Sequence, residues 1–447
     1  MKESFYNISI SVDDKNVLLY NTLTTSLVIL DSKIYNMIFQ FKDYSNGYCD
    51  TLFEMGFFVS DDFDEWKYLE NLRKSVIEAK NKISNIIIAP TLRCNANCYY
   101  CFLRNSNKKD MDFVTADSVI NYLVNNWNGN LLNISWFGGE PLLAEKIIDH
   151  FSLELTKHEV KYESKIITNG LLITPSILDK AKKHWNTQLV QISIDAIGDE
   201  YNKIKNYEKT KGSNPFNMIL DNLMCSLESG ISVRVRINTD PVNTAKSIDL
   251  MHFLHKKYSM FANFKAYFAP IDMVSEIVKP IAHSHKNITK HPYIQLLDVE
   301  RELGFCKGNQ RGEEENFIFD ANGLLTSLKI YPNTTNCYAS CPNVFSIDPL
   351  GDLYKCHRIL GRGDNFSCGN IKTGIVKNNI HDFFCSTTPS LAECHECKLM
   401  PICQGGCKVN FLEYKDIHAC VPFKSVINEL IMYYMNDKQK LLRKGNN

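Results

Sequence analysis

An excess of positive charge, long apolar runs and an export signal are all missing from this chain. Its 447 residues carry 50 basic and 50 acidic side chains, so it lacks the basic surplus that a nucleic-acid binder needs. No apolar run approaches the ~18 residues of a membrane span. The opening residues, MKESFYNISISVDD, contain no apolar signal-peptide core. The sequence therefore predicts a soluble, cytoplasmic protein that binds neither nucleic acid nor membranes.

Low-complexity linkers are also missing, and the composition is ordinary for a globular protein. Apolar residues make up 44% and charged residues 22% of the chain, which argues against bulk disorder. The length allows two to four domains, each with an ample core.

Cysteine is the one residue type present in an unusual amount. The chain has 16 cysteines, and most of them lie in two clusters. A secreted disulfide scaffold is short and carries an export signal, and this chain has neither property. Clustered cysteines in a reducing compartment instead predict ligands for metal ions or iron–sulfur clusters.

Apolar periodicity predicts two folded regions before the second cysteine cluster. Residues 1–80 contain three short β-type runs followed by helical spacing, which predicts a winged-helix-like α+β domain with more acidic than basic residues. Residues 81–305 alternate strands with amphipathic helices. The expected strands are 85–90, 133–138, 165–170, 189–195, 232–240 and 263–270. Six β/α repeats predict an α/β fold with parallel strands, either an open sheet or a partial barrel.

The alternation of strands and helices stops after residue 305. Residues 306–420 are rich in Gly, Pro, Asn and Cys, so bound metal clusters rather than an apolar core are expected to hold this region together. Residues 421–447 have helical periodicity and are expected to form a C-terminal helix.

The first cysteine cluster directly follows the first expected strand of the β/α region. Cys94, Cys98 and Cys101 have the spacing C-x3-C-x2-C. Three thiolates on one loop can ligate three irons of a [4Fe–4S] cube and leave the fourth iron open. A closed zinc site needs four ligands, and no fourth Cys or His lies nearby.

This cysteine loop resembles that of the radical S-adenosylmethionine (SAM) enzymes, with Tyr100 at the aromatic position. The sequence WFGGEP at 136–141 is similar to the glycine-rich SAM motif of that family. The resemblance extends through about residue 270 and implies a partial (β/α)6 barrel. It also implies a radical source, because one electron from the cluster cleaves SAM to methionine and a 5′-deoxyadenosyl radical.

The resemblance implies SAM contacts at the carboxyl ends of the strands, although it identifies no catalytic residue. The Gly138 and Gly139 carbonyls, with Glu140, are expected to accept hydrogen bonds from the SAM ammonium group. Strand-end residues are expected near the ribose and carboxylate, and the carboxylate partner is open between one lysine and two arginines. The implied set is Gly138, Gly139, Glu140, Pro141, Asn169, Ser193, Asp195, Lys205, Arg234 and Arg236.

The second cysteine cluster resembles the SPASM extension of radical SAM enzymes. Seven cysteines match its spacing, and Cys337 is a possible eighth. The resemblance implies two auxiliary [4Fe–4S] clusters, hence three in total. Cys337, Cys341, Cys356 and Cys407 would hold the first, and Cys394, Cys397, Cys403 and Cys420 the second. If Cys337 is not a ligand, the first cluster has an open iron. Zinc knuckles are the alternative, since C-x2-C pairs also bind zinc.

The expected function combines these parts with the N-terminal domain. That domain resembles the PqqD-like modules that bind a leader peptide by strand addition. The combination predicts an oxidoreductase that modifies a ribosomally made precursor peptide and forms an intrapeptide crosslink. A Cys thioether is the first expectation, and carbon–carbon and carbon–oxygen links remain open. A flavodoxin- or ferredoxin-like protein would donate electrons.

Two other functions remain open from the sequence. An anaerobic sulfatase maturase shares the cysteine motifs, but it has an Asp base after the cysteine aligned with Cys356, where this chain has His357. Such enzymes also generally lack the N-terminal domain. A non-catalytic iron–sulfur or zinc-binding protein is the second alternative, and it would have no use for a SAM pocket.

Overall fold

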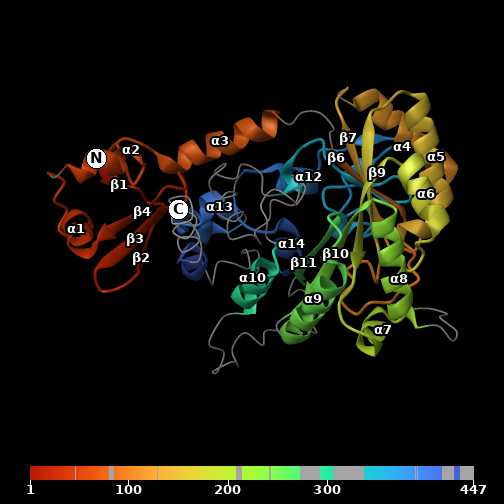
Figure 1. The fold of residues 1–447 in the computed structure, drawn as a ribbon. Coiled ribbons are helices and arrows are strands. Elements are labelled where there is room, and N and C mark those ends of the chain that lie inside the picture. Colours follow the sequence, from red (N-terminus) through yellow and green to blue (C-terminus); the bar gives the residue numbers. More distant parts are fainter. Residues whose placement is uncertain are drawn as a thin grey trace. The chain divides into compact units, whose positions relative to one another are not determined.

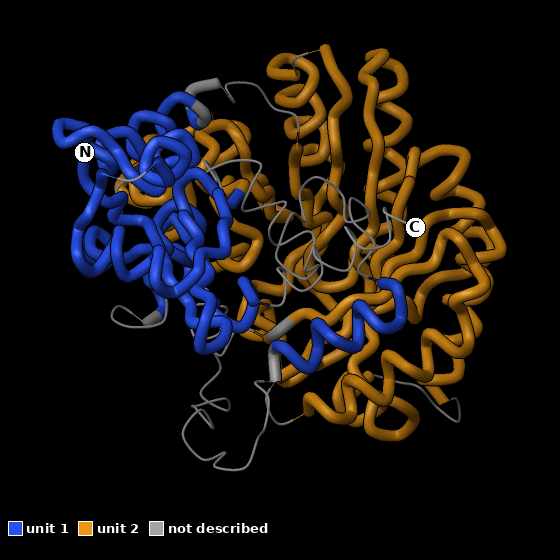
Figure 2. The backbone as a smooth tube through the Cα atoms, turned by 60° about the vertical axis from the view of Figure 1, so that its left-hand side comes forward, with its two compact units in different colours: residues 1–79, 289–337, 386–447 blue, residues 80–288, 338–385 orange. Residues whose placement is uncertain are grey.

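The computed structural model describes most of the chain. The described residues are 1–45, 47–79, 85–127, 129–207, 214–240, 243–271, 292–305, 337–387, 389, 391–414 and 427–432. They form two compact units, coloured in Figure 2. Unit 1 contains residues 1–79, 289–337 and 386–447, and unit 2 contains residues 80–288 and 338–385. The region predicted as the SPASM domain is thus divided between the two units.

A parallel sheet forms the centre of unit 2, and all six expected strands are present. They are β6 (Asn85–Thr91), β7 (Leu132–Gly138), β8 (Tyr162–Thr168), β9 (Thr187–Ser193), β10 (Ser232–Thr239) and β11 (Phe264–Pro270). They lie in sequence order, β6 next to β7 through to β11, and each pair of neighbours is parallel. The predicted α/β fold class is confirmed.

The helices that connect these strands run along the outer face of the sheet (Figure 1). They are α4 (Phe113–Asn126), α5 (Glu145–Lys157), α6 (Pro175–Lys183), α7 (Asp199–Lys205), α8 (Pro215–Glu228) and α9 (Thr244–Tyr258), with a 3-10 turn η2 (Pro141–Ala144) before α5. Their starts follow from the sequence. Asp112 and Thr174 accept hydrogen bonds from backbone N–H groups of the first turns of α4 and α6.

The sheet continues beyond β6 into residues far along the sequence. Strand β12 (Ser346–Ile347) pairs parallel to β6, and β13 (Leu353–Tyr354) pairs antiparallel to β12. The remaining elements of this segment are η6 (Tyr338–Ser340), η7 (His357–Ile359), β14 (Gly369–Asn370), β15 (Gly374–Ile375) and α12 (Asn379–Cys385). The sequence analysis expected no strand here, because two-residue strands have no readable periodicity.

Unit 1 begins with the expected three-stranded antiparallel sheet, in the order β2 (Asn7–Ser11), β3 (Asn16–Asn21), β4 (Leu27–Asp31). A second small sheet pairs β1 (Lys2–Glu3) with β5 (Phe58–Val59). The helices are α1 (Ser32–Tyr35), a π-turn η1 (Asn36–Gln40), α2 (Tyr48–Glu54) and α3 (Glu65–Ala79). The predicted strands and helices of this domain are therefore present.

Other described segments of unit 1 contribute to the apolar core of this N-terminal sheet. The rest of unit 1 includes α10 (Pro292–Glu302), η8 (Ala392–Glu396), α13 (Met400–Cys403) and α14 (Lys408–Tyr414). Leu18 and Tyr20 of β3 share an apolar cluster with Leu399, Ile402 and Cys403. The Lys398 ammonium donates to the Asn7 carbonyl at 2.8 Å, and the Thr22 hydroxyl donates to the Lys398 carbonyl. The N-terminal domain and this cysteine-bearing segment thus share one core.

Two predictions fall partly or wholly on residues outside the described ranges. Cys420 lies outside them, as does most of the expected C-terminal helix, of which residues 427–432 are described and helical. Among the helices of the described part of the chain, none is both long and apolar enough to span a membrane.

Candidate active site

The residues expected to contact SAM gather at one edge of the sheet of unit 2. Cys94 follows β6, Glu140 follows β7, Asn169 follows β8 and Asp195 follows β9, while Arg236 lies near the end of β10. Because the strands are parallel, their carboxyl ends meet at the same edge, where α/β folds place their ligands. These residues therefore lie where the sequence predicted the site, at the carboxyl ends of the parallel strands.

Gly138 and Gly139 are required where β7 meets the cysteine loop. A Cβ atom on Gly138 would lie 2.2 Å from the Thr91 carbonyl oxygen, and one on Gly139 would lie 2.0 Å from the Arg93 carbonyl oxygen. Gly138 also has a φ of +119°, which side chains disfavour. The Gly139 N–H donates to the Thr91 carbonyl at 3.0 Å. Because these two residues have no Cβ, the backbone of residues 91–93, which leads to Cys94, can pack directly against them. The expected contact of the two glycines with a ligand remains a prediction.

Glu140 is completely buried, and its carboxylate joins the ends of two strands. It accepts hydrogen bonds from the Thr168 hydroxyl at 2.8 Å, the Asn169 N–H at 2.8 Å and the Leu142 N–H at 3.1 Å. Burial raises its pKa to about 7, and the three donors oppose that rise. The expected contact with the SAM ammonium group stays a prediction. In the structure, the Glu140 carboxylate fixes the end of β8. Pro141, the next residue after Glu140, is buried at the start of η2.

The cysteine loop brings Cys98 and Cys101 close enough to Cys94 to affect the protonation of its thiol. Burial raises the pKa of the Cys94 thiol to about 12, and Cys98 and Cys101 contribute to the rise. Cys94 Sγ also accepts from the Ala96 N–H at 3.4 Å and from the Asn169 side-chain amide at 3.8 Å. Donors aimed at a buried sulfur stabilise the thiolate over the thiol.

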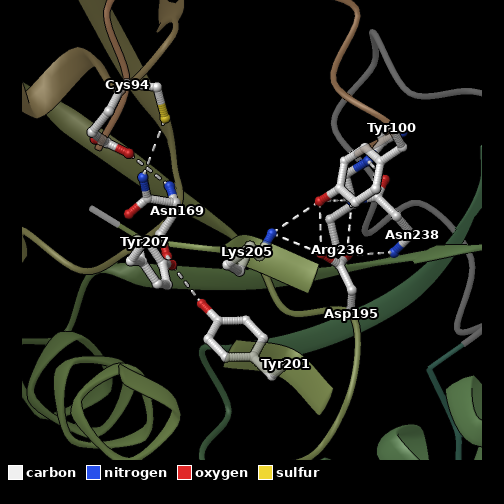
Figure 3. A network of polar contacts seen from close by, with 10 residues as sticks. Cys94, Tyr100, Asn169, Asp195, Tyr201, Lys205, Tyr207, Arg236 and Asn238 are labelled. Carbon is white, nitrogen blue, oxygen red and sulfur yellow. Dashed lines mark hydrogen bonds and ion pairs between the residues drawn. The ribbon is translucent and has the colours of Figure 1, made fainter. Parts of the chain in front are cut away.

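A buried ion pair lies beside this loop (Figure 3). Lys205 Nζ is 2.7 Å from Asp195 Oδ2, and each side chain is 2% exposed. The Tyr100 hydroxyl donates to the same Oδ2 at 2.6 Å and accepts from Lys205 at 3.0 Å. Asn238 donates to Asp195 Oδ1 through its backbone N–H at 3.1 Å and its side-chain amide at 2.9 Å. Every oxygen of the Asp195 carboxylate thus has protein donors.

This pair changes what can be expected of Lys205. Burial opposes its charge, but Asp195 and the surrounding groups outweigh burial and keep the pKa of Lys205 above its usual value. Its ammonium group is neutralised within the protein, and its backbone carbonyl accepts from the Asn97 N–H at 2.8 Å. Lys205 therefore holds the cysteine loop in place, and the choice of Lys205, Arg234 or Arg236 as the partner of a ligand carboxylate remains a prediction.

Arg236 lies in register with Ser193, the last residue of β9. Its Nε donates to the Asn238 side-chain oxygen at 2.9 Å, and its guanidinium carbon lies 6.0 Å from the centre of the Tyr267 ring. Arg234, two residues earlier, is 8% exposed. Arg236 is half-buried, whereas Lys205 is enclosed, so Arg236 has the more open position at the carboxyl edge.

His357 lies among aromatic rings from three parts of unit 2. The rings of Phe102, Phe137 and Tyr338 have centroids 5.8, 5.0 and 5.9 Å from that of His357. The Tyr338 hydroxyl is 2.6 Å from Nδ1 and accepts from the His357 backbone N–H at 2.8 Å. Burial lowers the pKa of His357 to about 3, so the ring is neutral at physiological pH. Phe102 directly follows Cys101 in the sequence, so the group of aromatic rings around His357 is joined to the cysteine loop.

The C-terminal cysteines are divided by the two units. Cys341 and Cys356 lie buried in unit 2, whereas Cys394, Cys397, Cys403 and Cys407 belong to unit 1, as does the exposed Cys337. The fourteen cysteines that the structure describes form no disulfide with one another. Within the described ranges, no three His, Cys, Asp or Glu side chains converge as the ligands of one metal ion would. The two ligand sets predicted here remain predictions, and Cys420 is outside the described residues.

Sequence reasoning missed the polar residues that hold the site together. Asn238 and Tyr100 complete the shell around Asp195, and Tyr207, whose hydroxyl lies 2.7 Å from that of Tyr201, lies beside Asn169 in Figure 3. Asn238 follows the apolar strand residues of β10, so its place at a strand end was a readable signal. The pairing of Tyr100 with Asp195 spans 95 residues and had no local signal.

Comparison with known proteins identifies the family of the domain that contains this site. Residues 88–254 match the radical SAM superfamily. The chain is a radical SAM enzyme. It is 24% identical to the radical SAM cyclopropyl synthase TigE of Paramaledivibacter caminithermalis over 96% of this chain and 95% of that protein. It is 25% identical to a cysteine-type anaerobic sulfatase-maturating enzyme of Clostridium perfringens over 73% of this chain and 89% of that protein.

A solved structure has the same fold as this radical SAM enzyme. Streptococcus suis SuiB bound to its precursor peptide SuiA aligns with a TM-score of 0.53 and 16% identity, over 94% of this chain and 98% of that one. The fold of the radical SAM enzyme implies a [4Fe–4S] cluster and SAM. The loop of Cys94 fits such a cluster, since a half-buried thiol with two N–H donors becomes a favourable ligand once a metal deprotonates it.

Proposed function

We propose that this radical SAM enzyme modifies a ribosomally made precursor peptide by forming a new bond within it. The observation that carries the proposal is the N-terminal domain of unit 1, which shares a core with the segment of the second cysteine cluster. A relative matched over nearly the whole chain, this domain included, is a cyclopropyl synthase. The match to the sulfatase-maturating enzyme covers less of the chain.

In this proposal, Cys94, Cys98 and Cys101 hold the cluster that binds SAM, and the two sets of C-terminal cysteines hold two further [4Fe–4S] clusters. When bound, the cluster and SAM supply a 5′-deoxyadenosyl radical that removes a hydrogen atom from the peptide. Glu140, Asn169 and the Asp195–Lys205 pair fix the loop and strand ends that surround SAM. Arg236 is the proposed partner of the SAM carboxylate.

The two edges of the N-terminal sheet support the proposed PqqD-like role. Within the described residues, β2 and β4 each pair only with β3, which leaves one side of each strand open to a further strand. Ile29 on β4 is 38% exposed, although it is a large apolar residue. A leader peptide that added to β4 would gain backbone hydrogen bonds and cover Ile29. Such docking would raise the effective concentration of the core peptide at the radical site.

Carbon–carbon bond formation is the preferred reaction, on the strength of the full-length match to a cyclopropyl synthase. The Cys thioether that the sequence alone favoured is the second candidate. Both reactions remove two hydrogens from the peptide, so both require an electron acceptor, which the auxiliary clusters would supply. We place the enzyme in the cytoplasm, with a flavodoxin- or ferredoxin-like donor.

The test is a mass measurement on short peptides encoded beside the gene, incubated with reduced, reconstituted enzyme and SAM. A loss of about 2 Da, the mass of two hydrogens, is expected. If cysteine-free or alkylated peptide still loses 2 Da, the bond is not a thioether. Conversion of a cysteine to formylglycine would instead identify a sulfatase maturase. SAM cleavage without any change to such peptides would argue against the proposed substrate class.

A further inference from the structure

Helix α3 of the N-terminal domain contributes a buried cation to the core of unit 1. Arg73, in the middle of that helix, is 4% exposed. One terminal nitrogen of its guanidinium donates a long hydrogen bond, at 3.5 Å, to the Gln404 carbonyl. Within the described residues, Nε and the other terminal nitrogen have no acceptor. A guanidinium carries five N–H donors and stays charged in proteins, so such burial requires an anion nearby.

The groups that act on this guanidinium are few, and most of them are thiols. Burial lowers the pKa of Arg73, while Glu70, Cys403 and Cys394 raise it. Glu70, one turn earlier on α3, forms no hydrogen bond or ion pair with Arg73 in the described structure. A cysteine raises that pKa only as a thiolate, and a bound metal deprotonates a coordinated thiol outright. The two cysteines therefore lie near the cation without yet supplying the charge that it needs.

The same cysteines are predicted ligands of an iron–sulfur cluster. A [4Fe–4S] cluster with four thiolates is negatively charged, and its sulfurs accept hydrogen bonds that help to set its reduction potential. We propose that Arg73 is a positioning residue that neutralises and hydrogen-bonds the cluster held by Cys394, Cys397 and Cys403. This inference rests on the proposed function, in which those cysteines hold a cluster.

The packing around Arg73 explains why the N-terminal domain supplies the cation. Tyr6, Leu23 and Leu69 form an apolar cluster with Met400, and Cys394 packs against it. The ring of Trp66 lies 4.1 Å from that of His395. The cysteine-bearing segment thus packs on apolar and aromatic groups, with Cys403 buried and Cys394 half-buried, and a charged centre on its inner side needs compensation from within the protein.

The test compares Arg73→Met with Lys74→Met, which removes the same charge from an exposed neighbour on α3. In cluster-free protein, Arg73 lacks a counter-ion, so Arg73→Met is expected to raise the melting temperature. In reconstituted protein, the same change is expected to lower it. This reversal of sign is the signature of a cation that serves the cluster, because a merely structural residue shifts both forms in one direction. Lys74→Met should shift neither form.

The second readout is an electron paramagnetic resonance titration of the clusters. Loss of the positive charge should shift the one-electron reduction of one auxiliary cluster at least tenfold toward the oxidised form, which is about 59 mV. Arg73→Lys keeps the positive charge but loses the planar set of N–H donors. The reduction potential of the cluster in this variant should lie between those of the wild type and Arg73→Met. Loss of about four irons from well-folded Arg73→Met, as expected of one lost cube, would also support the proposal.

Two failures can be told apart. If Cys394→Ala contains as much iron as the wild type, the cysteines hold no cluster, and the proposed function is wrong at this site. If Cys394→Ala loses iron but Arg73→Met keeps the wild-type iron content, potential and direction of thermal shift, the role of Arg73 is refuted while the cluster stands.

Discussion

The buried pair of Asp195 and Lys205 predicts an asymmetric response to the loss of either partner. Removing one member of a buried ion pair costs about 3–5 kcal/mol, because the other charge remains buried. Lys205→Met leaves Asp195 with three donors, from Tyr100 and Asn238, so we expect a loss near 3 kcal/mol. Asp195→Asn leaves the ammonium with the Tyr100 hydroxyl at 3.0 Å and two aromatic rings, so we expect a loss near 5 kcal/mol.

The assay is urea unfolding of cluster-free protein, with Lys203→Met as the control, since Lys203 is exposed on the same helix. The double variant, Asp195→Asn with Lys205→Met, leaves no buried charge and should be more stable than Asp195→Asn alone. The coupling should lie near the upper end of the roughly 0.5–3 kcal/mol found for contacting residues. Equal losses in the two single variants, or strictly additive effects, would refute the reasoning.

Three further predictions concern the cofactors and the peptide. Gly139→Ala should displace the cysteine loop, since its Cβ would meet the Arg93 carbonyl, and should abolish SAM cleavage, whereas Gly47→Ala, with nothing within 4 Å, should be silent in the same assay. Cys94→Ala should abolish SAM cleavage and reduce the iron content by up to about four atoms, as a colorimetric iron assay would show; unchanged cleavage would contradict the assignment. Ile29→Lys should weaken binding of leader-bearing peptide at least tenfold in calorimetry while SAM cleavage persists, and Ser9→Lys on the exposed face of β2 should not; equal affinities would exclude the β4 edge.

The fold of the core could be predicted because its strands are short apolar runs with clear ends. All six strands were expected within a few residues of their observed bounds, and β6, β7, β8 and β9 are each followed by a residue expected at the site. Burial on both faces of a parallel sheet produces such runs, so the pattern is readable from a single sequence. The cysteine spacings were equally readable, because the ligands of a cluster lie close together in the chain.

Contacts between distant residues could not be predicted. Lys205 looked like a ligand for a carboxylate, and it is one, but the carboxylate belongs to Asp195. Glu140 is a predicted SAM contact, and the hydrogen bonds that its carboxylate accepts from Thr168, Asn169 and Leu142 had no signal in the sequence. The shared core of β3 with residues 399–403 joins parts of the chain almost 400 positions apart. No local periodicity encodes such pairings, because they depend on how the elements pack.

The short strand β12 protects one edge of the central sheet against aggregation. Strand β6, with the sequence NIIIAPT, would be the edge of its sheet if the sheet contained only β6–β11. An unprotected apolar edge recruits strands from other molecules. Ser346 and Ile347 occupy that edge instead, and the two-residue β13 beyond them offers little to recruit. A fragment that ended near residue 305 would therefore be prone to self-association, even with every residue of the SAM-binding edge in place.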